Sequence, residues 1–71
     1  MTAKDQRRLG EAIMLRRRRL GLRQQDLSER TGISQSYISG VERGLRPMNL
    51  DTLRRIAEGL DTTPAALLGD A

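Results

Sequence analysis

A chain of 71 residues lies near the lower limit of what one hydrophobic core can stabilise, so we expect a single domain spanning residues 1–71. Hydrophobic residues make up 37% of the chain but aromatic residues only 1%, which favours helices with an aliphatic core over a sheet. The 13 Lys and Arg residues exceed the 9 Asp and Glu residues, and the net charge of +4 suits a polyanionic partner. The same excess of arginine is equally compatible with solubility or with genomic base composition.

Cysteine and histidine are both absent, which excludes a disulfide framework, a conventional zinc site and catalysis by either side chain. No apolar run approaches the roughly 20 residues of a membrane span, and residues 2–8 are too polar for a signal peptide. Ser34, Ser36 and Ser39 have no His or Cys beside them, and no glycine-rich phosphate loop is present. We expect no enzymatic activity, no cofactor, no metal, no membrane association and a cytoplasmic location.

The first predicted element in chain order is an amphipathic helix over residues 5–20. Leu9 and Ile13 lie about one turn apart, Leu20 continues the apolar face, and arginines fill the positions before it. Nothing in this stretch alternates with a period of two, which argues against a strand. Gly21 follows as a helix terminator.

A short second helix is predicted over residues 24–31, with Leu27 facing inward and Gly32 supplying the positive φ that ends many helices. Arg23 stands at its N-cap, where Ser, Thr, Asp or Asn usually accepts a hydrogen bond from a free backbone amide. We therefore expect the start of this helix either to fray or to await an anion.

A third helix is predicted over residues 35–43. Ser34 is a favourable N-cap, Ile38 and Val41 lie three residues apart on one face, and Gly44 follows the last turn. Two short helices joined by a turn of about three residues are typical of a helix-turn-helix.

Two further helices complete a predicted compact all-α fold of five helices. Asn49 caps the fourth, over residues 50–59, and Thr63 caps the fifth, over residues 64–68, which has Pro64 at its first position. The fourth helix carries the strongest apolar stripe in the chain, formed by Leu50, Leu53, Ile56, Ala57 and Leu60.

The order and spacing of these residues resemble the lambda-repressor-like, Xre-type helix-turn-helix family, typified by small phage repressors and Cro proteins. The resemblance covers nearly the whole chain. It is carried by Leu9, Gly10, Ile13, Gly21, Leu22, Gln24, Leu27, Gly32, Ile33, Ser34, Gln35, Ile38, Ser39, Glu42, Arg43, Gly44, Leu50, Leu53, Ala57, Leu67 and Leu68. It implies that the third helix is a recognition helix lying in the major groove of duplex DNA.

The resemblance implies that the exposed face of the third helix contacts DNA bases. A Gln amide can pair with both N6 and N7 of adenine, so Gln35 is the first candidate for direct readout; the alternative is a solvated helix-start residue. Gly40 replaces the larger side chain that such domains often carry, either because backbone approaches DNA closely or because glycine is tolerated. The implied base-contacting residues are Gln35, Ser36, Ser39 and Gly40.

The resemblance also implies contacts to the phosphate backbone. The free amides at the start of the second helix suit a phosphate, which Arg23 and Gln24 would help to bind. Tyr37 would either place its hydroxyl on a phosphate or pack against the fourth helix. The implied phosphate-contacting residues are Arg23, Gln24, Tyr37, Arg43 and Arg46; the alternative for the arginines is surface solvation.

Arg17 and Glu42 match a pair that the family places between its first and third helices. The resemblance implies a structural ion pair that locks the first helix to the recognition helix, with little direct contact to DNA. Arg16, Arg18 and Arg19 are expected to be mostly solvated and to contribute a long-range attractive field.

The function implied is that of a sequence-specific regulator of transcription that binds double-stranded DNA and is encoded by a bacterium or phage. Because one short recognition helix reads few bases, we expect a homodimer on DNA, with contacts around Leu60 to Leu68. The subtype is left open between a repressor, a restriction-modification controller and an antitoxin. The alternative function is a protein–protein interaction module on the same fold, against which Gln24, Gln35, Arg43 and the basic charge argue.

Overall fold

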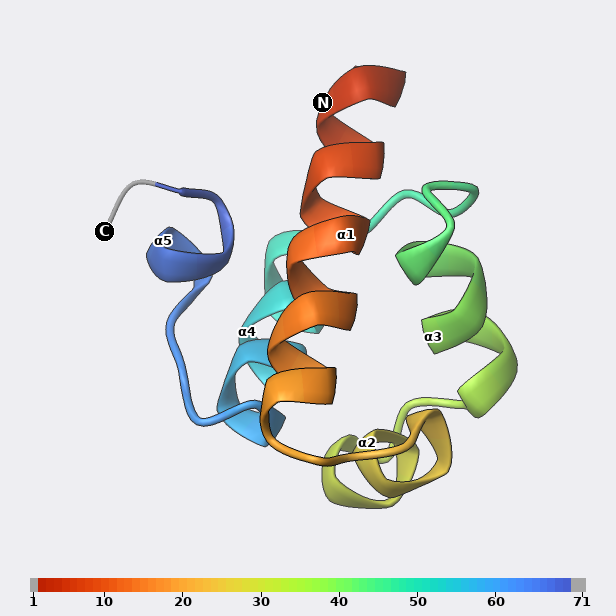
Figure 1. Ribbon diagram of the computed structural model, residues 1–71. Coiled ribbons are helices and arrows are strands. Elements are labelled where there is room, and N and C mark those ends of the chain that lie inside the picture. The colour runs from red at the N-terminus through yellow and green to blue at the C-terminus, as the bar shows by residue number, and fades with distance from the viewer. Residues whose placement is uncertain (1, 70–71) are drawn as a thin grey trace.

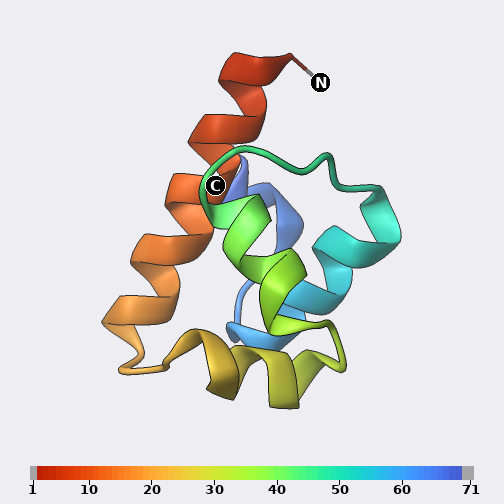
Figure 2. The ribbon, with the colours of Figure 1, turned by 90° about the vertical axis from the view of Figure 1, so that its right-hand side faces the viewer.

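Five helices follow one another along residues 2–69, the part of the chain that the computed structural model describes. They are α1 (Ala3–Arg19), α2 (Gln24–Thr31), α3 (Gln35–Glu42), α4 (Leu50–Gly59) and α5 (Pro64–Leu67). The long α1 runs through the middle, with α3 on one side of it, α5 on the other and α2 across its C-terminal end (Figure 1). Seen from the side of α3, that helix lies in front, with α2 below it (Figure 2). The predicted all-α class is confirmed.

The helix starts follow from local capping. Ser34, Asn49 and Thr63 each accept a hydrogen bond from the backbone amide three residues later, as the sequence predicts. The predicted start of α1 at residue 5 is wrong, because Thr2 and Asp5 form a capping box that begins the helix at Ala3. The Thr2 hydroxyl accepts from the Asp5 amide at 3.1 Å, and the Thr2 amide donates to the Asp5 carboxylate at 3.2 Å.

The predicted ends of α1, α3 and α5 are each one residue too far along the chain. Leu20, Arg43 and Leu68 lie at the C-cap, where the backbone amide still bonds back into the helix although the residue lies outside it. The predicted bounds of α2 and α4 are confirmed. Gly32 ends α2 with φ 72°, a left-handed conformation that glycine adopts without steric cost.

One aliphatic core joins all five helices. It consists of Leu9, Ile13, Leu27, Ile38, Val41, Leu53, Ile56, Ala57, Leu60 and Leu67. Leu50 was predicted to belong to the apolar stripe of the fourth helix, but it lies outside the core. It is the first residue of α4, and 57% of it is exposed. The remaining members of that stripe are buried.

The position of α3 is set by a close approach to α1. A Cβ atom on Gly10 of α1 would lie only 2.1 Å from the carbonyl oxygen of Val41 on α3, so no larger residue fits there without separating the helices. Ile13 of α1 and Val41 of α3 are both buried in the core that the two helices share. Helix α3 is therefore held directly against α1, the longest helix of the molecule.

Three arginine side chains donate hydrogen bonds to backbone carbonyls at the C-terminal ends of helices. Arg16 donates from Nε to the carbonyl of Leu60 at 2.9 Å and from Nη2 to that of Asp61 at 3.0 Å, so its predicted solvation is wrong. Arg30 donates to a carbonyl at the end of α4 and Arg55 to one at the end of α2, at 3.0 and 3.1 Å. A cation there satisfies free carbonyls and complements the helix dipole. These three guanidinium groups therefore stabilise the packing of the helices.

Candidate nucleic-acid interface

The turn between α2 and α3 is pinned by hydrogen bonds from α2. The Ser28 hydroxyl donates to the carbonyl of Ile33 at 2.6 Å, and the Ile33 amide donates to the Thr31 hydroxyl at 3.2 Å. The Thr31 hydroxyl in turn donates to the Leu27 carbonyl at 2.8 Å. The hydrogen bond of Ser28 fixes the angle at which α3 leaves the turn.

The N-terminus of α3 presents free polar side chains. Gln35 and Ser36 are exposed, and neither side chain makes a hydrogen bond to any residue within 2–69. Ser34 caps the helix by accepting from the Tyr37 amide at 3.1 Å, so the backbone that carries Gln35 and Ser36 is fixed. Ser39, the third predicted base-contacting residue with a side chain, is half-buried one turn further along. Gln35 and Ser36 are thus available to a ligand without breaking a protein contact.

Gly40, a predicted base-contacting residue, is covered by the side chain of Arg46, so a base could reach it only after Arg46 moves aside. The residue is buried beneath Arg46, which comes from the loop between α3 and α4. A Cβ atom on Gly40 would lie 2.6 Å from Cγ of Arg46. Glycine at this position makes room for the Arg46 side chain to cross the helix, a reason that neither of the two earlier interpretations of Gly40 contained.

Tyr37 holds the same loop against α3. Its hydroxyl donates to the carbonyl of Pro47 at 2.6 Å, and the guanidinium of Arg46 lies 6.0 Å from the centre of its ring. The two predicted roles for Tyr37 were a phosphate contact and packing against the fourth helix. A phosphate is only an acceptor, so the Tyr37 hydroxyl would have to release Pro47 in order to donate to it.

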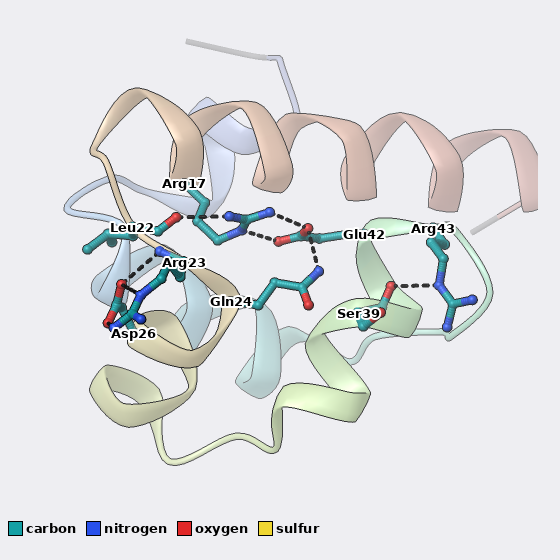
Figure 3. Close-up of polar contacts among 8 residues, drawn as sticks. All are labelled: Arg17, Leu22, Arg23, Gln24, Asp26, Ser39, Glu42 and Arg43. Carbon is teal, nitrogen blue, oxygen red and sulfur yellow. Dashed lines mark hydrogen bonds and ion pairs between the residues drawn. The ribbon is translucent and has the colours of Figure 1, made fainter.

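The ion pair expected between Arg17 and Glu42 is present. Nε and Nη2 of Arg17 donate to the two carboxylate oxygens of Glu42 at 2.7 and 2.9 Å, and Nη1 donates to the Leu22 carbonyl at 2.8 Å (Figure 3). The side chains are only 10% and 3% exposed. The hydrogen bonds to Glu42 raise the pKa of Arg17 above its usual value, against the opposing effect of burial. This bidentate pair ties α1 to the C-terminal end of α3.

Gln24, a predicted phosphate contact, joins the same carboxylate. Its side-chain nitrogen donates to Oε1 of Glu42 at 3.1 Å (Figure 3). An amide nitrogen carries two hydrogens, so one donor of Gln24 is left for a phosphate at the start of α2. One buried carboxylate therefore fixes α1, the start of α2 and the end of α3 relative to one another.

Arg23, the other predicted phosphate contact at this end of α2, is paired with Asp26. Its guanidinium lies 3.1 Å from Oδ1 of Asp26, and its backbone amide donates to Oδ2 at 2.8 Å. Hydrogen bonds from the side chain and then from the backbone of Arg23 lower the pKa of Asp26. No side-chain hydrogen bond caps the first amides of α2, as the sequence predicts, so these donors remain available to an anion next to the pair of Arg23 and Asp26.

Arg43 and Arg46 lie at the opposite end of the interface from Arg23. Both are exposed, and Arg43 makes one long hydrogen bond, 3.3 Å from its Nε to the Ser39 carbonyl (Figure 3). Neither forms a salt bridge with any residue in the described range 2–69. The surface thus has polar groups at the start of α3 and cations at both of its margins, an arrangement suited to a helix-sized groove between rows of phosphates.

Other kinds of site find no support within residues 2–69. No three residues among His, Cys, Asp and Glu come together there in a way that would hold a metal ion. No helix of this part of the chain is long and apolar enough to cross a membrane.

Residues 13–67 match the family model described as helix-turn-helix, and the chain belongs to this family. The class predicted from the sequence, a DNA-binding regulator of transcription with a helix-turn-helix, is confirmed at the level of the family.

Two curated relatives carry the description of HTH-type transcriptional regulators. One, an uncharacterised protein of Sinorhizobium fredii, is 37% identical over 65 residues, which cover 90% of this chain and 84% of the relative. The other, from Mycobacterium tuberculosis, is 38% identical over 58 residues, which cover 82% of this chain but 41% of the relative. This chain therefore spans about two fifths of the length of that longer protein.

Two solved structures of restriction-modification controller proteins share the fold. C.AhdI from Aeromonas hydrophila superimposes with a TM-score of 0.87 at 34% identity, covering 90% of this chain and 97% of that one. The C.Esp1396I tetramer in complex with its natural 35-base-pair operator superimposes with a TM-score of 0.84 at 26% identity, covering 92% of this chain and 86% of that one.

Proposed function

We propose that this protein regulates transcription by placing α3 in the major groove of duplex DNA and reading base edges with Gln35 and Ser36. The observation that supports the proposal is that these two side chains are unoccupied. They are exposed and free of protein hydrogen bonds, on a helix whose orientation is fixed by the buried pair of Arg17 and Glu42. Ser39, which is half-buried, would take part only where a base edge approaches the middle of α3.

Phosphate contacts come from the two margins of this surface. At one margin, Arg23 and the second amide hydrogen of Gln24 would bind a phosphate together with the free backbone amides that begin α2. At the other, Arg43 and Arg46 would bind the far strand. Tyr37 would join them only after releasing Pro47.

The subtype favoured by the comparisons is a restriction-modification controller. Both solved structures described above are controllers of this kind and match nearly the whole chain. Selection of bound duplexes from a random pool, followed by sequencing, would define the operator that such a controller recognises. The selected duplex is also the reagent for the measurements below.

We predict that binding to the selected duplex is steeply salt-dependent. Arg23, Arg43 and Arg46 supply three cations per protomer, hence six in a dimer, and each phosphate neutralised releases counterions. Raising the salt concentration from about 50 to about 200 mM should therefore weaken binding by about 10³-fold. Fluorescence anisotropy titrations over that range would measure the loss, and binding that is indifferent to salt would contradict the proposed interface.

We also predict that two protomers bind one operator symmetrically, with half-sites about 34–36 Å apart, one turn of the double helix. Leu60 and Leu67 of the predicted contact region are buried in the core of their own protomer, so they are not free to touch a partner. The exposed apolar side chains of the contact region are those of Ala65, Ala66 and Leu68. We propose that these side chains contact the second protomer.

Footprinting and sedimentation on the selected duplex would test this arrangement. A symmetric footprint with two protomers per duplex is the expected result. A duplex carrying a single half-site serves as the control and should bind one protomer weakly. One protomer on the full operator, with an asymmetric footprint, would contradict the dimer.

A further inference from the structure

Arg7 of α1 lies against the loop that follows the recognition helix. A Cβ atom on Gly44 would lie 2.4 Å from Cγ of Arg7 and 3.0 Å from its Cα, so the stem of Arg7 packs directly on the Gly44 backbone. Gly44 has φ 73° and comes immediately after Arg43. The structure thus brings a residue from the second turn of α1 next to the C-terminal margin of the proposed DNA surface.

Arg7 packs on Gly44, and Arg43 and Arg46 flank Gly44 in the sequence, so three arginines belong to this part of the molecule. Arg7, Arg43 and Arg46 are all exposed, and none forms a salt bridge with another described residue. Glu42, the acidic residue next to Arg43, is buried and paired with Arg17, and Glu11, one turn after Arg7 on α1, forms no salt bridge within residues 2–69. In Figure 3 the guanidinium of Arg43 points away from α1, toward Ser39.

Arg7 also differs from the arginines that stabilise helix packing through hydrogen bonds to backbone carbonyls. Arg16, Arg30 and Arg55 donate to helix carbonyls, whereas no protein hydrogen bond of the Arg7 guanidinium occurs within residues 2–69. Packing of its aliphatic stem on Gly44 restricts the side chain while leaving its charge exposed, which lowers the entropy lost when an anion is bound.

We infer that Arg7 is a further phosphate-contacting residue, which extends the interface from the helix-turn-helix onto α1. The inference rests on the proposed function, because its ligand is the backbone of the same duplex. Arg7, Arg43 and Arg46 together form a cationic cluster that contacts successive phosphates at the outer margin of α3.

The test compares Arg7→Met with the control Arg54→Met on the selected duplex. Methionine keeps the unbranched apolar stem that packs on Gly44 and removes the charge. Arg54 is also an exposed arginine, but it lies on α4, outside both the helix-turn-helix and the proposed dimer contact. Both variants should show the thermal unfolding of the wild type.

Losing two phosphate contacts per dimer should make the slope of log affinity against log salt shallower by about 1.8 for Arg7→Met. The ratio of wild-type to variant affinity should then fall by about 12-fold between 50 and 200 mM salt. Arg54→Met and the charge-retaining Arg7→Lys should keep the wild-type slope.

Equal slopes for the two methionine variants would overturn the inference, whether both match the wild type or both are shallower, because the effect would not be particular to Arg7. If Arg43→Met shallows the slope while Arg7→Met does not, the proposed function stands and this inference alone fails. If the wild type binds no duplex, both fail.

Discussion

Replacing Arg17 by methionine is expected to lower the free energy of unfolding by about 3–5 kcal/mol, the range for breaking a buried ion pair from one side. Arg17→Met leaves the carboxylate of Glu42 buried, with only Gln24 donating to it. A domain of this length has a total stability of roughly 4–11 kcal/mol, so the variant should be largely unfolded if the wild type lies near the lower limit. Urea denaturation followed by circular dichroism measures the change.

A matched control and a double variant distinguish the contribution of the ion pair to stability from that of its surroundings. Arg19→Met, at an exposed arginine of the same helix, should change stability by less than about 0.5 kcal/mol. Arg17→Met combined with Glu42→Leu should recover much of the loss, because no charge is then left buried without its partner. A double-mutant cycle with zero coupling energy would show that the pair contributes nothing to the fold.

Replacing Gln35 by alanine should cost about 1–3 kcal/mol of binding free energy per half-site and relax the base preference at one position in each half-site. The side chain has no protein partner within the described residues, so its loss should leave the fold unchanged. Binding to a panel of single-base variants of the selected duplex measures both effects.

Two further variants complete this test. Gln25→Ala removes the same amide from an exposed position on α2 and should leave the base preference intact. Arg43→Ala should weaken binding to all sequences similarly and make the salt slope shallower. If Gln35→Ala changes neither affinity nor preference, α3 does not read bases as proposed. The protein-interaction module then becomes the better hypothesis, and a pull-down for partners the better experiment.

The features that the sequence predicted correctly are those with local signals. Ser34, Asn49 and Thr63 mark helix starts and Gly32 marks a helix end, because caps and positive φ angles are demanded by the adjacent backbone alone. The capping box of Thr2 has the same kind of signal, since an acidic residue follows three positions later.

Contacts between residues distant in the sequence were predicted only where the family resemblance supplied them. Arg17 and Glu42 were paired in that way, although 25 residues separate them. No such information existed for Arg16, whose partners lie 44 and 45 residues away, and its surroundings in sequence are those of an ordinary solvated arginine. Arginine reaches backbone carbonyls from many positions, so composition and periodicity do not reveal which arginines do so.

The crossing of Arg46 over Gly40 makes these two positions an epistatic pair. A methyl group added at Gly40 would meet Cγ of Arg46, part of a flexible exposed side chain, so the substitution would displace that side chain and spare the core. A larger residue at position 40 would thus gain a place on the recognition surface at the expense of the arginine now covering it. Any change of base preference engineered at position 40 has to be designed together with position 46, because one patch of surface is shared between them.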